Sequence, residues 1–498
     1  MHPLAQLDHD YAWHPFTQMR DWLRTEPILI ERGRGALLHD VYGRRYIDAN
    51  SSIWTNLHGH NHPRINQAIR RQLARIAHSS ALGFANEPAS LLAEQLVLAA
   101  QPPQAESTVR RPASLEPGSR LIAARPKIAK AFFSDNGSTA LEVALKLAFE
   151  FSRRTLCIRE PRFVSMAGGY HGDTLGAVSL GHIDLFHKAY SPLLFKTDSI
   201  MAPYCYRCPF NRAKPERIDA RENRKCNWEC LAQVEKVFRA QKRRRGPYSG
   251  FIFEPLMQGA AGMIPQPVGW LSKACGIARE QGALLVADEV MTAFGRTGTA
   301  RGLQTAARAS EPQSILASHQ EEVSPDFVCL AKGLTGGYVP MAATLTTEPV
   351  FNAFLGRYED FKTFFHGHSF TGNQIGAAAA LASLKLLKDR SQVRARLQLE
   401  RVFEQKLNTL WKRSRVGDVR RVGLVAGVEL VKDWRTREPF ALTDRAGIRV
   451  CERMARRGVL TRSIGNVIVL MPPYCTTAEQ LNRTIEVLSR SIRDELGD

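Results

Sequence analysis

The sequence predicts an α/β fold with a mostly parallel sheet and helices on both faces. Short apolar runs recur along the chain, and each is followed by a turn and then by a helical pattern. This alternation is typical of a parallel sheet that helices cover on both sides. Runs that are apolar throughout indicate strands buried on both faces. The predicted strands are 128–133, 163–166, 250–253, 283–287 and 327–330.

Length and composition are those of a globular enzyme. The chain has 498 residues, of which 44% are hydrophobic and 23% charged, which excludes a disordered class. The net charge of +20 raises the possibility of nucleic-acid binding. The basic residues are spread along the chain, however, and the one dense run, Lys242–Arg245, closes a predicted helix. We therefore expect no specific nucleic-acid partner.

The beginning of the chain is not that of a secreted protein. Residues 1–11 are mostly polar and lack the apolar core of a signal peptide. No apolar run approaches the length of a membrane-spanning helix. We expect no membrane association and a cytoplasmic location.

Four of the nine cysteines form two close pairs, Cys205 with Cys208 and Cys226 with Cys230. Such pairs resemble a structural four-cysteine zinc site. The alternative is a packed cysteine-rich loop. We favour it because the second pair has wider spacing and stands at a predicted helix start, residues 227–229. We expect no metal here.

The N-terminal region carries aromatic residues and histidines. Residues 12–19 form an aromatic arm broken by proline, and 37–47 predict a hairpin with its turn at Tyr42-Gly43. Three histidines follow within 58–63, before a predicted helix over 65–77. No carboxylate or cysteine stands at metal-ligand spacing beside them. We expect these histidines to pack and cap rather than bind metal.

A phosphate site is possible at the predicted helix 139–151, which has a wide apolar face and is therefore buried. Gly137 and Ser138 stand at its start, where free backbone N–H groups, a hydroxyl and the positive end of the helix dipole suit a phosphate. Ordinary capping by Asp135 or Ser138 explains the same pattern. The sequence alone does not separate the two.

Lys332 follows the strand 327–330 and precedes a glycine-rich turn that ends at Gly337. At the edge of an apolar core the ammonium form is disfavoured, and a neutral amine can form a Schiff base with an aldehyde. The alternative is a lysine that extends into solvent. We propose that the aldehyde is pyridoxal phosphate (PLP).

Asp288 supports this interpretation. It follows the apolar run 284–287, where a carboxylate is costly unless it meets a cation. The pyridinium nitrogen of PLP is such a cation. Ligands bind at the carboxyl ends of strands in sheets of this kind. Five polar residues follow predicted strands at those ends: Ser138, Tyr170, Glu254, Asp288 and Lys332.

Several motifs carry a family resemblance. Ala287–Gly298, Ala331–Gly337 and Gly169–Asp173 resemble the signatures of class III PLP-dependent aminotransferases, which have PLP fold type I. The resemblance extends from about residue 12 to the C-terminal helix, with 102–127, roughly 300–324 and part of the cysteine loop as additions. Four further segments resemble the branch of this family that acts on 8-amino-7-oxononanoate in biotin biosynthesis: Trp13–Met19, Ser51–Trp54, Phe365–Asn373 and Leu470–Pro473.

The resemblance implies roles at matching positions. Lys332 would hold the cofactor and move the substrate proton, and Asp288 would pair with the ring nitrogen. Gly137 and Ser138 would bind the phosphate. Tyr170 would stack on the ring and line the substrate pocket.

A homodimer with active sites at the subunit interface is also implied. His368 and Ser369 match residues that complete the phosphate site of the partner. Arg462 matches the arginine that holds the substrate carboxylate. Arg296 is a second carboxylate candidate, with a structural ion pair as the alternative. The other predicted substrate contacts are Phe16, Ile53, Trp54 and Gly367.

The resemblance divides the chain into a large PLP-binding domain, 51–389, and a smaller α+β domain built from both chain ends, 1–50 and 390–498. The last part independently predicts alternating helices and strands. Helices are expected at 397–411 and 446–457, and strands at 424–430 and 467–471.

The function that we predict is amino transfer to 8-amino-7-oxononanoate, with S-adenosylmethionine as donor. Phe16 and Ile53 stand where most members of this branch carry tyrosine and tryptophan. Together with His368 they resemble a smaller branch that uses lysine, so the donor stays open. One alternative is another class III omega-aminotransferase. The other alternative is a basic nucleic-acid-binding protein, which would need none of the strand-end residues.

Overall fold

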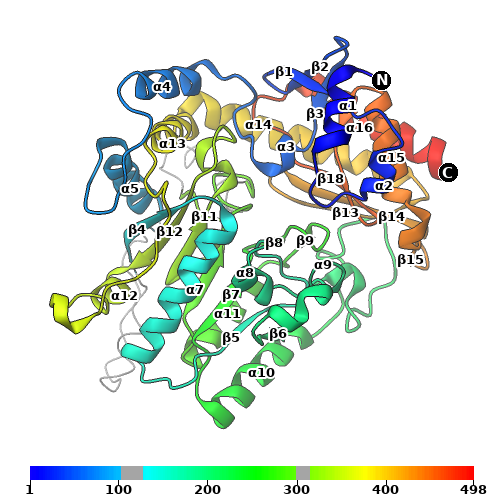
Figure 1. Ribbon diagram of the computed structural model, residues 1–498. Helices are drawn as coiled ribbons and strands as arrows, with labels where there is room; N and C mark the ends of the chain where they lie inside the picture. Colours follow the sequence, from blue (N-terminus) through cyan, green and yellow to red (C-terminus); the bar gives the residue numbers. More distant parts are fainter. Residues whose placement is uncertain (102–126, 299–313) are drawn as a thin grey trace.

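The structure is a computed structural model that describes residues 1–101, 127–298 and 314–498. At its centre lies a seven-stranded sheet with the order β4-β12-β11-β10-β7-β5-β6 (Figure 1). Within this sheet β12 runs antiparallel to β11 and β4, and the other pairs are parallel. The predicted mostly parallel sheet is confirmed. Its strands are β4 (Ile128–Ser134), β5 (Phe163–Met166), β6 (Asp198–Ile200), β7 (Gly250–Phe253), β10 (Leu285–Asp288), β11 (Phe327–Leu330) and β12 (Ala342–Thr347).

Helices cover both faces of this sheet. On β7, Phe251 and Phe253 pack into one layer, whereas Ile252 between them packs into the opposite layer. A strand buried on both faces needs apolar side chains at every position, which is why these strands are unbroken apolar runs. The layers consist of α7 (Gly137–Arg154) on one face, and of α5 (Glu87–Ala99), α10 (Glu229–Arg245), α11 (Trp270–Glu280) and α13 (Gln374–Leu387) on the other.

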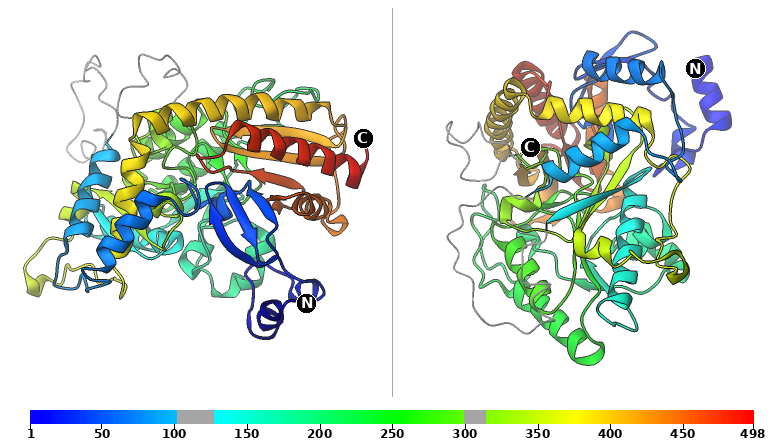
Figure 2. Two further views of the ribbon diagram at one scale, coloured as in Figure 1. Left: turned by 90° about the horizontal axis from the view of Figure 1, so that it is seen from above. Right: turned by 90° about the vertical axis from the view of Figure 1, so that its left-hand side faces the viewer.

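A second lobe joins the two ends of the chain. The two-residue strand β16 (Val459–Leu460) pairs in parallel with β3 (Arg45–Asp48), so residues from both ends share one sheet. Figures 1 and 2 place the blue N-terminal strands beside the orange and red C-terminal elements. The expected smaller α+β part from both chain ends is confirmed. It includes β1 (Ile30–Arg34), β2 (Leu37–Asp40), β13 (Val416–Val422), β14 (Val425–Asp433), β15 (Glu438–Pro439), β17 (Ser463–Ile464), β18 (Val467–Leu470), α14 (Arg390–Leu407), α15 (Ala446–Arg456) and α16 (Ala478–Leu496).

The remaining helices and strands lie around these two sheets. The short pair β8 (Met257–Gln258) and β9 (Ile264–Pro265) follows β7. Other helices are α1 (Pro3–Tyr11), α2 (Met19–Trp22), α3 (Ser51–Trp54), α4 (Pro63–Leu73), α8 (Leu175–Ser179), α9 (Asp184–His187) and α12 (Glu348–Asn352).

Some expectations differ from the structure. The helix α1 precedes the aromatic arm, and its short polar pattern did not predict it. The N-cap of α7 is Asn136 rather than Asp135 or Ser138. The additions expected at 102–127 and about 300–324 lie largely outside the described residues. The described part after residue 313 includes Leu316, which is buried in the core.

The structure gives the cysteines and histidines local partners. Burial raises the pKa of Cys205 to about 12, and the neighbouring thiols of the two pairs add to this shift. In the three described ranges, no three or more His, Cys, Asp and Glu side chains group in a way that could hold a metal ion. His62 caps α4, and His58 contacts the Ser383 hydroxyl at 3.0 Å. No helix in those ranges is both long and apolar enough to span a bilayer.

Candidate active site

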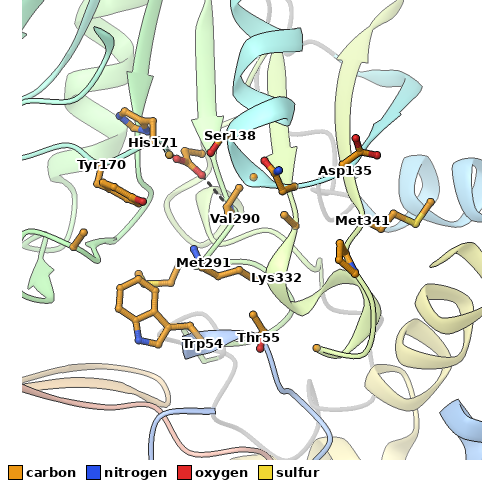
Figure 3. A pocket seen from close by; sticks show the side chains of 18 of the residues that line it. Trp54, Thr55, Asp135, Ser138, Tyr170, His171, Val290, Met291, Lys332 and Met341 are labelled. Atoms are coloured by element: carbon orange, nitrogen blue, oxygen red, sulfur yellow. Dashed lines mark hydrogen bonds and ion pairs between the residues drawn. The ribbon is translucent and has the colours of Figure 1, made fainter. Parts of the chain in front are cut away.

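A pocket of about 450 Å³ opens where the parallel strands end (Figure 3). This volume is in the range of small-molecule and cofactor sites. The carboxyl ends of β5, β7, β10 and β11 meet at one edge because these strands are parallel. Six of the predicted site residues line the pocket: Trp54, Gly137, Ser138, Tyr170, Asp288 and Lys332.

Lys332 enters the pocket directly after β11. The chain turns sharply behind it at Gly337, where φ is +86° and a Cβ atom would lie 2.8 Å from the backbone of Asn56. The Lys332 Nζ atom lies 5.2 Å from the centre of the Trp54 ring, as the facing side chains in Figure 3 illustrate. Burial lowers the pKa of Lys332, against the opposing charges of nearby carboxylates. A neutral, nucleophilic amine is therefore accessible in this pocket.

Asp288 ends β10 and is held through both of its carboxylate oxygens. Oδ1 accepts the backbone N–H of Val290 at 3.1 Å, and Oδ2 lies 2.7 Å from Nδ1 of His171. Burial alone would lower the pKa of His171, but the hydrogen bond and charge of Asp288 raise it. The imidazole thereby fixes the orientation of a carboxylate that is only 5% exposed.

Glu254 is a second buried acid in the pocket. Its carboxylate accepts the backbone N–H groups of Gly259 at 2.8 Å and Tyr170 at 3.4 Å. Burial raises the pKa of Glu254 to about 7; His171 opposes this shift and the charge of Asp288 adds to it. The pocket therefore holds one acid that accepts a proton near neutral pH.

The start of α7 forms another wall. Asn136 accepts the Thr139 N–H at 3.1 Å, and the earlier N–H groups of a helix have no intrahelical partner. The Ser138 hydroxyl accepts the N–H of Asp173 at 3.1 Å. A Cβ atom on Gly137 would lie 2.8 Å from Val290, so this wall depends on glycine. A helix start of this kind binds anions such as phosphate.

Tyr170 forms an aromatic wall of the pocket. Its hydroxyl donates to Asp173 at 2.7 Å, and its ring lies parallel to that of His187 with centroids 6.3 Å apart. Burial is the largest of the effects that raise the pKa of Tyr170, so the phenol stays neutral.

The family described as "Aminotransferase class-III" matches residues 19–492. The chain belongs to the class III aminotransferase family. The predicted family membership is thereby confirmed.

The relatives of this class III aminotransferase include proteins named adenosylmethionine-8-amino-7-oxononanoate aminotransferase. The one from Geobacter sulfurreducens is 42% identical over 494 residues, which cover 99% of this chain and 98% of the relative. That from Nitratidesulfovibrio vulgaris is 43% identical, with 98% of this chain and 81% of the relative covered.

Solved structures agree with the fold. The enzyme of the same name from Methanocaldococcus jannaschii has a TM-score of 0.80 and 35% identity, with 99% of each chain covered. An omega transaminase from Pseudomonas jessenii, in complex with PMP, has a TM-score of 0.83 and 25% identity, with 99% of this chain and 98% of that chain covered.

Six predicted residues of this class III aminotransferase do not line the described pocket. Phe16 is 57% exposed and packs edge-on against Phe186, with ring centroids 5.3 Å apart. Phe186 in turn contacts Tyr170, so the N-terminal arm reaches the aromatic wall indirectly. Ile53 is 44% exposed beside the lining residue Trp54.

The other four lie farther along the chain. Arg462 is exposed, and its charge lowers the pKa of Tyr170, which places it within electrostatic range of the pocket. His368 pairs with the lining residue Asp135 at 3.2 Å. Gly367 and Ser369 are exposed on the same loop.

Sequence reasoning assigned no role to His171 or Glu254. His171 lies inside the motif Gly169–Asp173, and Glu254 follows a predicted strand, so both had a positional signal. Their contacts with Asp288 and the Gly259 N–H depend on loops whose paths the sequence does not specify. Arg296 is fully buried and donates to backbone carbonyls, outside the pocket lining.

The raised pKa of Glu254 predicts a pH-dependent stability. The pKa is about 7 in the folded chain, against 4.5 for an ordinary glutamate. The folded state then binds the proton of Glu254 more tightly than the unfolded state does, so the free energy of unfolding falls as pH rises from 4.5 towards 7. Glu254→Gln stays neutral. Relative to the parent, its free energy of unfolding should rise by roughly 3 kcal/mol across this window, at about 1.4 kcal/mol per unit.

Urea unfolding of the apoprotein, followed from pH 4.5 to 7.5, measures this difference. Glu348→Gln, at an exposed position, serves as the control and should run parallel to the parent. A Glu254→Gln curve that also runs parallel to the parent would contradict the buried-acid assignment.

Proposed function

We propose that this protein transfers an amino group to 8-amino-7-oxononanoate, giving 7,8-diaminononanoate for biotin biosynthesis. The observation that carries the proposal is one edge of the central sheet. There a buried amine, a hydrogen-bonded carboxylate and a helix start face the same pocket. The names of relatives that cover nearly the whole chain support the acceptor and S-adenosylmethionine as the donor.

The pocket residues fit pyridoxal phosphate as the cofactor. Lys332 supplies an amine for its aldehyde, Asp288 a carboxylate for its pyridinium nitrogen, and Gly137 and Ser138 a helix start for its phosphate. The close contact of Gly137 with Val290 leaves no room for a larger residue at that wall. When bound, the cofactor provides a conjugated ring that accepts electrons from the substrate carbon.

The side chains of this chain then perform separate tasks. Lys332 Nζ removes the proton from the substrate carbon that bears nitrogen and returns a proton later, which its lowered pKa permits. His171 keeps Asp288 oriented. Tyr170 and Trp54 form walls of the pocket and exclude water. Arg462 binds the substrate carboxylate with its planar guanidinium.

We further propose a homodimer in which His368 and Ser369 act at the active site of the partner. An exposed apolar surface supports this. Leu82 is 88% exposed and Phe370 60%, and their two segments are joined by a hydrogen bond from His78 to the Ser369 carbonyl. Exposed apolar patches of this kind mark interaction sites.

The domain division is also a proposal. The boundary after residue 50 follows β3, and the boundary after residue 389 falls between α13 and α14. The large domain would be 51–389, with 1–50 and 390–498 as the smaller one. A cytoplasmic location remains part of the same proposal.

A second candidate is amine transfer by another class III transaminase. The fold match to the Pseudomonas jessenii omega transaminase favours it, because its TM-score of 0.83 is no lower than the 0.80 of the Methanocaldococcus jannaschii enzyme. Turnover of 8-amino-7-oxononanoate, tested beside simple amines, separates the two candidates.

The first prediction of this proposal is that Lys332→Ala loses nearly all turnover. Both cofactor attachment and proton transfer depend on this amine, so we expect the rate to fall by several orders of magnitude. Asp288→Asn should fold normally, bind the cofactor more weakly and slow the reaction. Steady-state assays with 8-amino-7-oxononanoate measure both effects. Normal turnover by Lys332→Ala would refute the assignment.

The second prediction concerns the donor. Phe16→Tyr adds a hydroxyl that makes one polar contact with the donor. Such a contact is worth roughly 0.5 to 1.5 kcal/mol, or up to about tenfold in affinity for the donor. Phe16→Tyr should therefore raise the preference for S-adenosylmethionine, and the parent should accept lysine measurably. Single-turnover spectra with each donor test this. The hypothesis that lysine is a donor fails if lysine gives no conversion and Phe16→Tyr alters the conversion with neither donor.

A further inference from the structure

Residues Ser51–Trp54, the short segment α3, form a left-handed helical turn beside the pocket. Their φ angles are +47°, +46°, +63° and +70°, in four consecutive residues that are not glycine. Left-handed helical backbone costs L-residues about 1–2 kcal/mol each. Such a conformation persists only where its surroundings fix it, and it is common at functional sites.

The left-handed turn carries Trp54 into the pocket. The indole is 8% exposed, lines the pocket, and lies with its ring centre 5.2 Å from Lys332 Nζ. Figure 3 shows the ring on the side of the pocket opposite Ser138, with the lysine between them. A right-handed or extended path through these four residues would direct the indole elsewhere.

Asp48 fixes the beginning of the left-handed turn. Its Oδ1 accepts the N–H groups of Asn50 at 3.2 Å and Ser52 at 3.1 Å. Its Oδ2 accepts the Ser52 hydroxyl at 2.9 Å and pairs with His60 Nε2 at 2.9 Å. The Asn50 side chain also accepts the indole N–H of Trp54 at 2.9 Å.

Arg296 holds the backbone that follows the left-handed turn. Its Nη2 donates to the Asn56 carbonyl and its Nη1 to the Pro472 carbonyl, both at 2.9 Å. The carbonyl before Pro472, that of Met471, accepts the Ser51 hydroxyl at 2.6 Å. The guanidinium thus ties the left-handed turn to the exit of β18 on the other lobe.

The burial of Arg296 argues against contact with substrate. Its side chain is 1% exposed, and it is absent from the pocket lining. Among the described residues, the side chain of Arg296 donates to two backbone carbonyls and not to a carboxylate. The planar fork of arginine can reach two carbonyls at once, whereas the point donor of lysine cannot hold the same geometry.

We propose that Arg296 is a positioning residue, which clamps the left-handed turn so that Trp54 stays against Lys332 and closes the pocket. The inference rests on the proposed function only in taking this pocket as the reaction site. Loss of the clamp allows the strained residues to relax, and Trp54 then moves out towards solvent.

The experiment measures how well Trp54 is protected. The chain has seven tryptophans, so the emission of Trp54 is isolated by subtracting a matched variant that also carries Trp54→Phe. Acrylamide quenching of the purified holoenzyme is compared between the parent and Arg296→Lys. We expect a several-fold rise in the quenching constant of Trp54, with a lower kcat and little change in KM for the acceptor.

Arg420→Lys is the matched control. Arg420 is equally buried, donates to the Gly262 carbonyl in a network with Glu429, and does not line the pocket. It should lower thermal stability without exposing Trp54. If Arg296→Lys does not fold, Ser51→Ala, which removes the hydrogen bond to Met471, should expose Trp54 in the same assay.

Unchanged protection of Trp54 in the folded Arg296→Lys variant would overturn the proposal, as would equal exposure in Arg420→Lys. If Arg296→Lys does not fold, unchanged protection in Ser51→Ala would overturn it too. A large rise in KM with Trp54 still protected would assign Arg296 to the substrate carboxylate instead. The quenching measurement needs no substrate. It therefore distinguishes failure of this inference from failure of the proposed reaction.

Discussion

The Lys332 amine lies in a pocket whose other ionisable groups decide its charge. Burial disfavours its ammonium form, while Asp288 and Glu254 favour it. Burial outweighs the carboxylates and lowers the pKa of the amine, which suits it to accept a proton. This balance depends on the sheet, because the acids and the lysine stand at the ends of adjacent parallel strands. It also depends on His171, which holds Asp288 through one carboxylate oxygen.

Segments that lie far apart in the chain form this pocket. The central sheet provides the amine, the acids and the helix start, whereas the N-terminal part provides Trp54 on a strained turn. The C-terminal part meets that turn through Met471 and Pro472. Strain at the pocket wall is thus supported by hydrogen bonds that cross the lobes.

Much of this arrangement could be predicted from the sequence. An unbroken apolar strand precedes Lys332, and polar residues follow several other strands. Because parallel strands end together, these patterns indicate both the sheet and the edge at which the pocket lies. The left-handed turn could not be predicted, because Ser51–Trp54 contains no glycine to indicate positive φ. The role of Arg296 was equally hidden. Its partners are carbonyls about 240 and 176 residues away along the chain, which no local pattern encodes.

Reduction with borohydride followed by peptide mapping tests the central claim most directly. The reagent fixes a Schiff base between the cofactor and its lysine, and mass spectrometry then locates the added mass. We predict a single labelled peptide that contains Lys332, with loss of the visible absorption band. Label on a different lysine, or none in protein purified with the cofactor, would contradict the account.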